Sequence, residues 1–366
     1  MPYYLGVDAG GTKTLAAVCD DSGRVAGTGL AGASNYQDVG PAAAVRALTA
    51  ATTQALERAG ASRGDVVAAC YGVSGADREA DFKTIRDFLQ AVSPTPRFTL
   101  VNDTLVALRA GTDDGVGVCC IGGTGANCIG RNRLGVIKKV GGLGWVSGDS
   151  GSAGQIVADA LTAALQGREG RAPETALYGR LCAALNVKSL DDVIELGFFG
   201  QLRVFDFGRL APLVFETASA GDAVAQDLLA RHGRGVARAA LCAIRTLFGA
   251  GDEVVVVLGG SVLQRGTHDA LRDALAAALQ AGHAPTRLVK LEVEPVLGAL
   301  LLARDAHTGS AGRDFTRRLR DSYRPPTGGA GSGPIPGGGS GPVPVPSAGS
   351  GPMPAGGSGP VSSGAG

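Results

Sequence analysis

One pattern occurs twice in this chain, and it constrains the fold more than any other feature. Residues 3–9 form an apolar run that ends in Asp8-Ala9, and the turn sequence Gly10-Gly11-Thr12-Lys13-Thr14 follows. Residues 115–121 form a second apolar run, which Gly122-Gly123-Thr124-Gly125 follows. Each copy is typical of a strand, a Gly-Gly-Thr turn and two further strands. The repeat predicts two lobes of the same topology, each beginning with the same kind of turn.

The first of these turns has a composition suited to phosphate. Glycine lets the backbone approach a ligand closely, and backbone amides together with Thr12, Lys13 and Thr14 can hold phosphate oxygens. Asp8, at the strand end, is placed to hold a hydrated Mg²⁺. Gly-Gly is also common in plain β-hairpin turns, so this stretch alone leaves both interpretations open.

The rest of the chain alternates predicted strands and helices, which indicates an α/β fold. Further strands are expected at 15–20, 24–30, 66–73, 98–101, 127–131, 135–140, 253–258 and 287–293. Helices are expected at 41–60, 153–166, 174–185, 189–196, 222–249 with a break near Gly233, 267–281 and 295–306, and another begins at Thr104. We predict lobes at 1–106, completed by helix 295–306, and at 107–294. Residues 325–366 repeat Gly, Ser and Pro without a charged residue, which is typical of disorder.

The composition argues against several classes of partner. The net charge is +1 and there is no basic block, so neither a nucleic acid nor a membrane surface is an expected partner. No signal peptide and no apolar run of membrane-spanning length are found, and we therefore expect a cytoplasmic protein. The seven cysteines lack CxxC spacing, and we expect them to be reduced and mostly buried. The four histidines lie away from the glycine turns in sequence, which gives no support to histidine catalysis or a histidine metal site.

Four glycine-rich turns follow predicted strands, at Gly10, Gly123, Gly142 and Gly259. Ligands of α/β folds bind at the carboxyl ends of strands, and two such turns facing each other could grip the β- and γ-phosphates of a nucleotide. The chain lacks GxxxxGK[ST] and a strand followed by GxGxxG, which excludes a P-loop protein and disfavours a dinucleotide fold.

Three polar residues are candidates for contacts with a substrate. Asp103 follows a strand and precedes a helix, where it could accept the proton of a sugar hydroxyl or simply cap the helix. Asp149 also precedes a helix, where it could bind a sugar hydroxyl or cap that helix. Asn35 could bind a sugar or occupy a turn, and the turn is favoured on local grounds.

The ordered set of motifs resembles the BadF/BadG/BcrA/BcrD ATPase family and, within it, the N-acetylglucosamine kinases. The resemblance covers residues 3–306 and rests on Asp8–Thr14, Asn35, Val73–Asp77, Asn102-Asp103, Gly123–Cys128 and Gly148–Ala153. It implies an actin-like, ribonuclease-H-like fold of two lobes around a nucleotide cleft. It also implies ATP and Mg²⁺ as cofactors, transfer of the γ-phosphoryl group to a sugar 6-hydroxyl, and a homodimer.

The resemblance also implies a role for each matching position. ATP would contact Gly10, Gly11, Thr12, Lys13, Gly123 and Thr124 through its phosphates, and Gly259, Gly260 and Ser261 near its adenosine. Asp8 would hold Mg²⁺ through water. The sugar would contact Asn35, Asp103, Gly142, Leu143, Gly144 and Asp149, with Asp103 as the base.

Several functions compatible with this resemblance stay open. N-acetylglucosamine is the expected sugar, and glucosamine, N-acetylmuramic acid and glucose are the alternatives. Some relatives are instead ATP-hydrolysing activators of 2-hydroxyacyl-CoA dehydratases, which would require two exposed cysteines per chain for a shared iron–sulfur cluster. A third alternative is a sugar-sensing or assembly protein that binds ATP without catalysis, although Asp8 and Asp103 argue against it.

Overall fold

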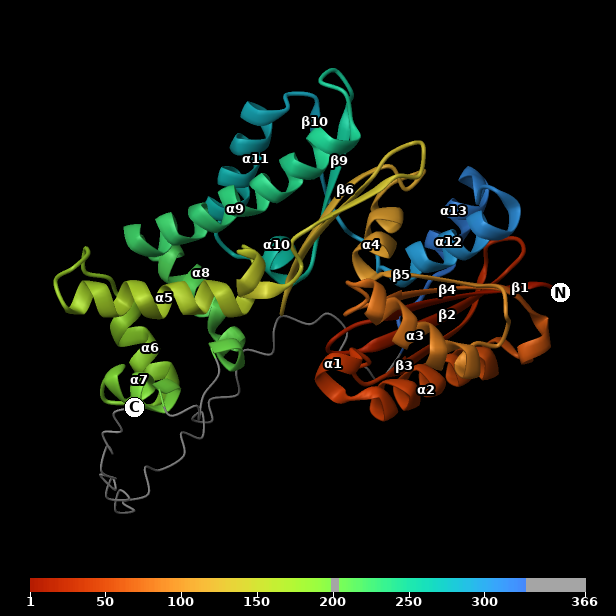
Figure 1. Cartoon of the computed structure of the whole chain (residues 1–366), viewed down its shortest axis with the longest axis horizontal. Helices are drawn as coiled ribbons and strands as arrows, with labels where there is room; N and C mark the ends of the chain where they lie inside the picture. The colour runs from red at the N-terminus through yellow and green to blue at the C-terminus, as the bar shows by residue number, and fades with distance from the viewer. Residues whose placement is uncertain (199–203, 327–366) are drawn as a thin grey trace, which may run out of the picture.

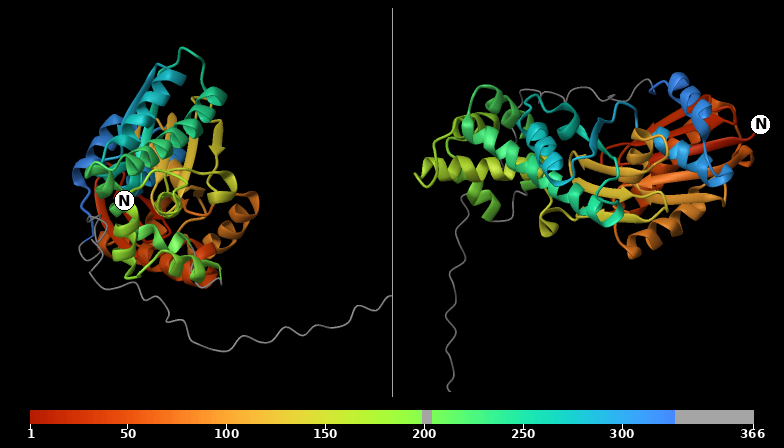
Figure 2. Two further views of the ribbon diagram at one scale, coloured as in Figure 1. Left: turned by 90° about the vertical axis from the view of Figure 1, so that its left-hand side faces the viewer. Right: turned by 90° about the horizontal axis from the view of Figure 1, so that it is seen from above.

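The computed structural model describes residues 1–198 and 204–326, and within them the chain forms two lobes side by side (Figures 1 and 2). Each lobe is built on one five-stranded mixed sheet. The first sheet has the order β3-β2-β1-β4-β5, and the second has the order β10-β9-β6-β7-β8. The strands are β1 Tyr3–Ala9, β2 Thr14–Asp20, β3 Val25–Ala31, β4 Val66–Val73, β5 Phe98–Asn102, β6 Gly117–Gly122, β7 Ala126–Arg131, β8 Ile137–Val140, β9 Val254–Gly259 and β10 Thr286–Lys290.

The two sheets have the same topology. In each, the first three strands form an antiparallel meander. A fourth strand pairs in parallel with the first strand of that meander, and a fifth pairs in parallel with the fourth. The predicted duplication and the two-lobe α/β fold are therefore confirmed. The predicted boundary after residue 106 falls inside a helix, α4, and the limits of the two lobes stay a prediction.

Helices cover both faces of each sheet (Figure 1). They are α1 Tyr36–Val39, α2 Pro41–Ala59, α3 Glu79–Val92, α4 Asp103–Gly111, α5 Ala153–Arg168, α6 Leu177–Leu185, α7 Asp191–Phe198, α8 Ala211–Ser219, α9 Ala223–Leu247, α10 Ser261–Arg265, α11 Ala270–Gly282, α12 Val296–Thr308 and α13 Gly312–Ser322. In the first lobe, α2 and α3 pack on one face and α12 and α13 on the other. Because the central strands are buried on both faces, they are apolar nearly throughout.

Helix α4 joins the two lobes. Its residues Leu105 and Leu108 pack against Cys119 and Ile129 of the second sheet. On another side it meets α12 so closely that a Cβ on Gly298 would lie 1.9 Å from the carbonyl oxygen of Val106. The first residue of this helix is therefore held by contacts with both halves of the chain.

The structure corrects three expectations about helices. Helix α9 is unbroken at Gly233, where a Cβ would lie 2.0 Å from the carbonyl oxygen of Leu271, so this glycine permits close packing against α11. Helices α8 and α13 lie in segments where none was expected, and α13 buries Phe315 and Leu319 on the first lobe. The predicted disordered tail falls almost entirely on residues 327–366, outside the described residues.

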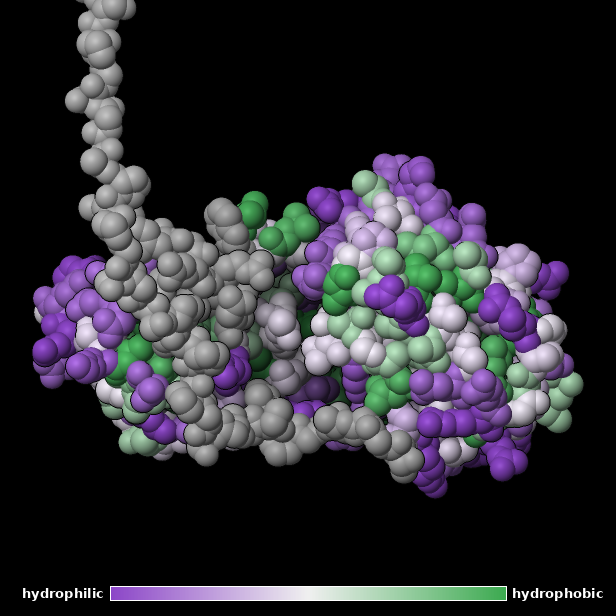
Figure 3. All heavy atoms as spheres, turned by 90° about the horizontal axis from the view of Figure 1, so that it is seen from below, coloured by the Kyte–Doolittle hydropathy of each residue, from purple (hydrophilic) through white to green (hydrophobic). Residues whose placement is uncertain are grey.

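The surface is mixed in character. In the view from below, hydrophilic and apolar residues alternate over the first lobe, and a hollow lies between the two lobes (Figure 3). No helix in residues 1–198 and 204–326 has the length and apolar character needed to cross a membrane.

Candidate functional site

The first-lobe turn is a β-hairpin that keeps its tip open. Ala9 pairs with Thr14 across β1 and β2, and the amide of Gly10 donates to the carbonyl oxygen of Lys13 at 2.9 Å. Gly11 and Thr12 are exposed at the tip. The hydroxyl of Thr14 is buried and bonded 2.7 Å from the Ser34 hydroxyl, so it supports the turn from behind. The hairpin and phosphate interpretations of this stretch are therefore compatible.

The second-lobe turn repeats this arrangement. Gly122 pairs with Ala126 across β6 and β7, and Thr124 is exposed at the tip. A Cβ on Gly123 would lie 3.8 Å from the amide nitrogen of Ser261, so the turn after β9 lies beside the turn after β6. The structure thus brings together Gly123, Thr124, Gly259, Gly260 and Ser261 at the carboxyl ends of two parallel strands.

Asp103 is the first residue of α4 and is not its cap. The cap is Asn102, whose side chain accepts a hydrogen bond from the amide of Thr104 at 3.0 Å. The capping interpretation of Asp103 is therefore wrong, and its carboxylate accepts a hydrogen bond from the Thr104 hydroxyl at 3.4 Å. Desolvation, followed by the nearby negative charge of Asp77, raises the pKa of Asp103 to about 6.

Asp8 lies at the end of β1 in a similar environment. Desolvation, and then the carboxylates of Asp103 and Glu294, raise the pKa of Asp8 to about 7, while Lys13 opposes that rise. The three carboxylates of Asp8, Asp103 and Glu294 lie near a single lysine, Lys13, and this excess of negative charge favours the binding of a cation. Among the described residues no cluster of three or more His, Cys, Asp or Glu side chains is arranged to hold a metal directly.

Lys13 is paired with a residue from the other end of the chain. Its Nζ lies 3.1 Å and 3.4 Å from the two carboxylate oxygens of Glu294, just before α12. The side chain of Lys13 is 36% exposed, so it can still reach a ligand at the turn.

Asp149 organises the loop in which it lies, residues 141–149. Its carboxylate accepts hydrogen bonds from the amides of Gly142 at 3.0 Å and Gly144 at 2.8 Å. The cap of α5 is Ser152, so the capping interpretation of Asp149 is also wrong. Leu143 is exposed on this loop. A cavity of about 230 Å³ lies between the loop, β7 and α9.

Asn35 caps the short helix α1. Its Oδ1 accepts from the amide of Gln37 at 3.2 Å, and its Nδ2 donates to Asp38 at 2.6 Å. A Cβ on Gly75 would lie 2.5 Å from Asn35 Oδ1, so Asn35 lies against the loop that follows β4. Asn35 thus has a structural role in this part of the first lobe, in keeping with the turn interpretation.

Several residues at the site were not singled out by the sequence. Glu294 and Lys139 reach it through long-range contacts that no local motif signals. His232 corrects the expectation that the histidines lie away from the glycine-rich turns. It is 3% exposed, and its Nδ1 accepts a hydrogen bond from the amide of Gly151 at 3.2 Å, just after the loop 141–149. Its other ring nitrogen lies 3.2 Å from Asp159, so it supports that segment from within the lobe.

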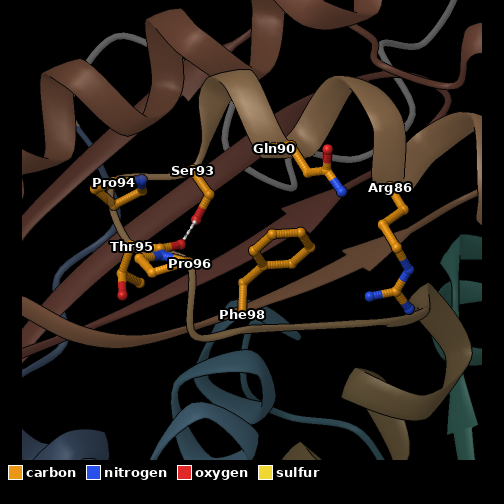
Figure 4. A pocket seen from close by; sticks show the side chains of 7 residues that line it. All are labelled: Arg86, Gln90, Ser93, Pro94, Thr95, Pro96 and Phe98. Carbon is orange, nitrogen blue, oxygen red and sulfur yellow. Dashed lines mark hydrogen bonds between the residues drawn. The ribbon is translucent and has the colours of Figure 1, made fainter.

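A second pocket lies elsewhere on the first lobe (Figure 4). It has a volume of about 450 Å³ and is lined by Arg86, Gln90, Ser93, Pro94, Thr95, Pro96 and Phe98. These residues belong to the end of α3 and the start of β5, at the opposite end of β5 from Asp103. None of the predicted site residues lines this pocket.

The duplicated sheets, with matching glycine turns at the ends of their central strands, define an actin-like two-lobe α/β protein. The chain belongs to the BadF/BadG/BcrA/BcrD ATPase family, whose family model matches residues 5–303.

Named relatives cover nearly all of the two lobes. An N-acetylmuramic acid/N-acetylglucosamine kinase of Clostridium acetobutylicum is 27% identical over 304 residues, 83% of this chain and 99% of that relative. An N-acetyl-D-glucosamine kinase of Dictyostelium discoideum is 28% identical over 312 residues, 82% of this chain and 97% of that relative. A solved structure from Chromobacterium violaceum, provisionally assigned as an N-acetylglucosamine kinase, is 25% identical with a TM-score of 0.64. The match covers 83% of this chain and 99% of the solved chain.

Proposed function

We propose that this protein is an ATP-dependent amino sugar kinase that transfers the γ-phosphoryl group to the 6-hydroxyl of N-acetylglucosamine. The observation that carries the proposal is the placement of Asp103. Its carboxylate is desolvated and close to Asp8. Asp103 follows β5, which runs parallel to β4 and β1, so it lies at the same edge of the first sheet as the glycine turn after β1. The names of the relatives support an amino sugar as the acceptor.

In this mechanism Asp103 accepts the proton of the sugar 6-hydroxyl as the hydroxyl oxygen bonds to the γ-phosphorus and the bond to the β-phosphate oxygen breaks. A pKa of about 6 leaves most of this carboxylate ionised at neutral pH. The amides of Gly10, Gly11 and Gly123, with Thr12, Thr124 and Lys13, would hold the phosphates of ATP. Gly259, Gly260 and Ser261 would lie near the adenosine. The chain contributes by orienting the reactants and by offsetting charge.

Mg²⁺ belongs to the proposal as the cation that Asp8 would hold through water. When bound, it would offset the charge of the phosphates. The negative surroundings of Asp8, from Asp103 and Glu294, are what support this assignment.

The sugar would contact Asn35, Asp103 and residues 141–149, which we call the sugar loop. In that loop the contacts would come from Gly142, Leu143, Gly144 and Asp149. Because Asp149 accepts hydrogen bonds from the amides of Gly142 and Gly144, it would contact the sugar while also stabilising the conformation of the loop. Glucosamine and N-acetylmuramic acid are the alternative substrates, because a few atoms near the sugar 2-position decide that choice.

The activator alternative receives no support from the cysteines. All seven lie in the described part of the chain, and only Cys242 is exposed. A cluster shared across a dimer would need two accessible thiolates from each chain. A homodimer and a cytoplasmic location remain parts of the proposal, and the free cysteines are in keeping with that location.

The deciding experiment measures ADP release with N-acetylglucosamine, N-acetylmuramic acid, glucosamine and glucose at saturating MgATP. We expect the highest kcat/KM with N-acetylglucosamine. Asp103→Asn should retain sugar binding and lose at least about 100-fold in turnover, the usual scale for a general base. Asp87→Asn, on the exposed face of α3, is the matched control. Sugar-independent ADP release, or near-normal kinetics of Asp103→Asn, would overturn the proposal.

A further inference from the structure

The buried amide of Asn102 connects the residues around Asp103. Asn102 is 5% exposed, and its Nδ2 donates to the carbonyl oxygen of Ala76 at 3.3 Å and to Asp77 Oδ1 at 3.0 Å. Its Oδ1 accepts from the amide of Thr104, in the first turn of α4. The orientation of the Asn102 amide therefore determines how the helix that begins with Asp103 is capped.

The second lobe completes this arrangement with two side chains. Asn127 on β7 donates from its Nδ2 to Asn102 Oδ1 at 3.1 Å, so all four hydrogen-bonding positions of the Asn102 amide are used. The Oδ1 of Asn127 accepts from the amide of Cys128 at 2.9 Å, which fixes which way the Asn127 amide faces. On β8, Lys139 Nζ lies 2.5 Å from Asp77 Oδ1, and these two side chains are 22% and 13% exposed.

These bonds join the lobes at one place. We define the interlobe latch as the four side chains Asp77, Asn102, Asn127 and Lys139. In the first lobe, Asn102 is the last residue of β5 and Asp77 lies in the loop after β4. In the second lobe, Asn127 and Lys139 lie on the neighbouring strands β7 and β8. A bridge between two rigid bodies can form only when those bodies are correctly placed relative to each other, so the latch reports on the relative position of the lobes.

The sugar loop rests on the second-lobe half of this latch. A Cβ on Gly142 would lie 2.5 Å from Asn127 Oδ1 and 2.8 Å from Lys139 Cε, and Gly142 has a φ of +83°. Only glycine fits this position without displacing both side chains. A movement of the loop on sugar binding would therefore be felt directly by Asn127 and Lys139.

We propose that the interlobe latch positions the carboxylate of Asp103, and that Lys139 and Asn127 transmit the state of the sugar loop to it. The inference rests on the proposed function in one respect, which is the role of Asp103 as the base. Lys139 and Asn127 are positioning residues, because they reach the reacting group only through Asp77 and Asn102. The base would hold its working geometry only while the latch joins the two lobes, so phosphoryl transfer would depend on the relative position of the lobes.

Electrostatics gives the latch a signature that a purely structural contact lacks. The charged groups around Asp103 are Asp8 from β1, Asp77 from the loop after β4 and, through Asp77, Lys139 from β8. Lys13 and Glu294 form a separate pair beside Asp8. The charge of Asp77 raises the pKa of Asp103. Removing the compensating Lys139 should raise it further, and removing the charge of Asp77 should lower it.

The kinetic test compares Lys139→Met, Asp77→Asn and Lys139→Arg with Lys138→Met. Lys138 is the matched control, because it is the neighbouring lysine on β8 and has no ion pair with a described residue. We expect kcat to fall about tenfold in Lys139→Met, since small errors of position are costly, with KM for ATP changed less than about twofold. Lys139→Arg should recover most of that loss. The acidic limb of kcat/KM should move to higher pH in Lys139→Met and to lower pH in Asp77→Asn.

A second measurement does not depend on catalysis. In hydrogen exchange, the peptide that covers the first turn of α4 should exchange faster in Asn127→Ala and Lys139→Met than in the wild type or Lys138→Met. If the wild-type protein phosphorylates no amino sugar, the proposed function fails, and the exchange experiment still decides whether the latch holds α4. Unchanged exchange at α4 in both variants, or acidic limbs that shift in the same direction, would overturn the latch.

Discussion

The ammonium group of Lys13 lies 3.1 Å from a carboxylate oxygen of Glu294, a residue 281 positions further along the chain. The contact joins the first glycine turn to the start of α12, so the beginning and the end of the family region meet at the proposed phosphate site. The same glutamate contributes to the raised pKa of Asp8. A ligand phosphate at this turn would compete with Glu294 for the lysine.

Lys13→Met should weaken ATP binding selectively. We expect KM for ATP to rise about tenfold, which corresponds to about 1.4 kcal/mol, because a charged partner of the phosphates is lost. The KM for the sugar should stay the same. Lys83→Met, which removes a lysine from an exposed ion pair on α3, is the control. An unchanged KM for ATP would restrict Lys13 to its structural pairing with Glu294.

The pH profile of kcat/KM should show a single acidic limb, which reports one ionising group. Because the pKa of Asp103 is raised to about 6, kcat/KM for the sugar should fall about tenfold per pH unit below that value, as the carboxylate takes up a proton. The rates must be measured at saturating MgATP, since a bound cation favours the ionised form of Asp8. A limb that stays near pH 4 would contradict a desolvated base.

Asp8→Asn should stabilise the ligand-free protein while abolishing activity. Folded Asp8 keeps its proton up to about pH 7, whereas an unfolded aspartate releases it near about pH 3.9. This side chain's favourable contribution to folding is therefore present below about pH 4 and is lost as the pH rises to about 7. Without Mg²⁺, Asp8→Asn should melt above the wild type at pH 8, by about 2–4 °C for each 1 kcal/mol gained. That difference should shrink at pH 5. An equal difference at both pH values would contradict the raised pKa.

Gly298→Ala should separate α12 from α4. The new Cβ would lie 1.9 Å from the Val106 carbonyl oxygen, and we expect a loss of about 1–3 kcal/mol in the free energy of unfolding. The kcat should fall as well, because α4 begins with Asp103. Gly179→Ala is the matched control on α6, where nothing lies within 4 Å of the added Cβ. That variant should gain up to about 1 kcal/mol from helix propensity. Denaturant unfolding of both variants provides the measurement.

The local pattern of the sequence was sufficient for the two hairpins and the duplicated sheets. Strand periodicity and glycine turns depend on neighbouring residues, so the repeat at residues 3–14 and 115–125 directly predicts the topology that both lobes adopt. The same pattern placed Asp103 between a strand and a helix. The pattern could not show whether Asp103 caps the helix or is its first residue. That distinction depends on which side chain accepts a hydrogen bond from the amide of Thr104.

Only the tertiary structure decided which distant groups surround the candidate site. Glu294 contacts Lys13, and Lys139 contacts Asp77, although each pair is far apart in the sequence. No local sequence motif identifies Glu294 or Lys139 as part of the site. Gly233 resembles a helix breaker in sequence, but in the structure it is the place where α9 approaches α11. The sequence by itself determined the strands, the turns and the family. The pKa of Asp103 and its connection to the second lobe arise only when folding desolvates the carboxylate and brings Asp77 and Lys139 together, since these electrostatic effects depend on distance in space and on burial.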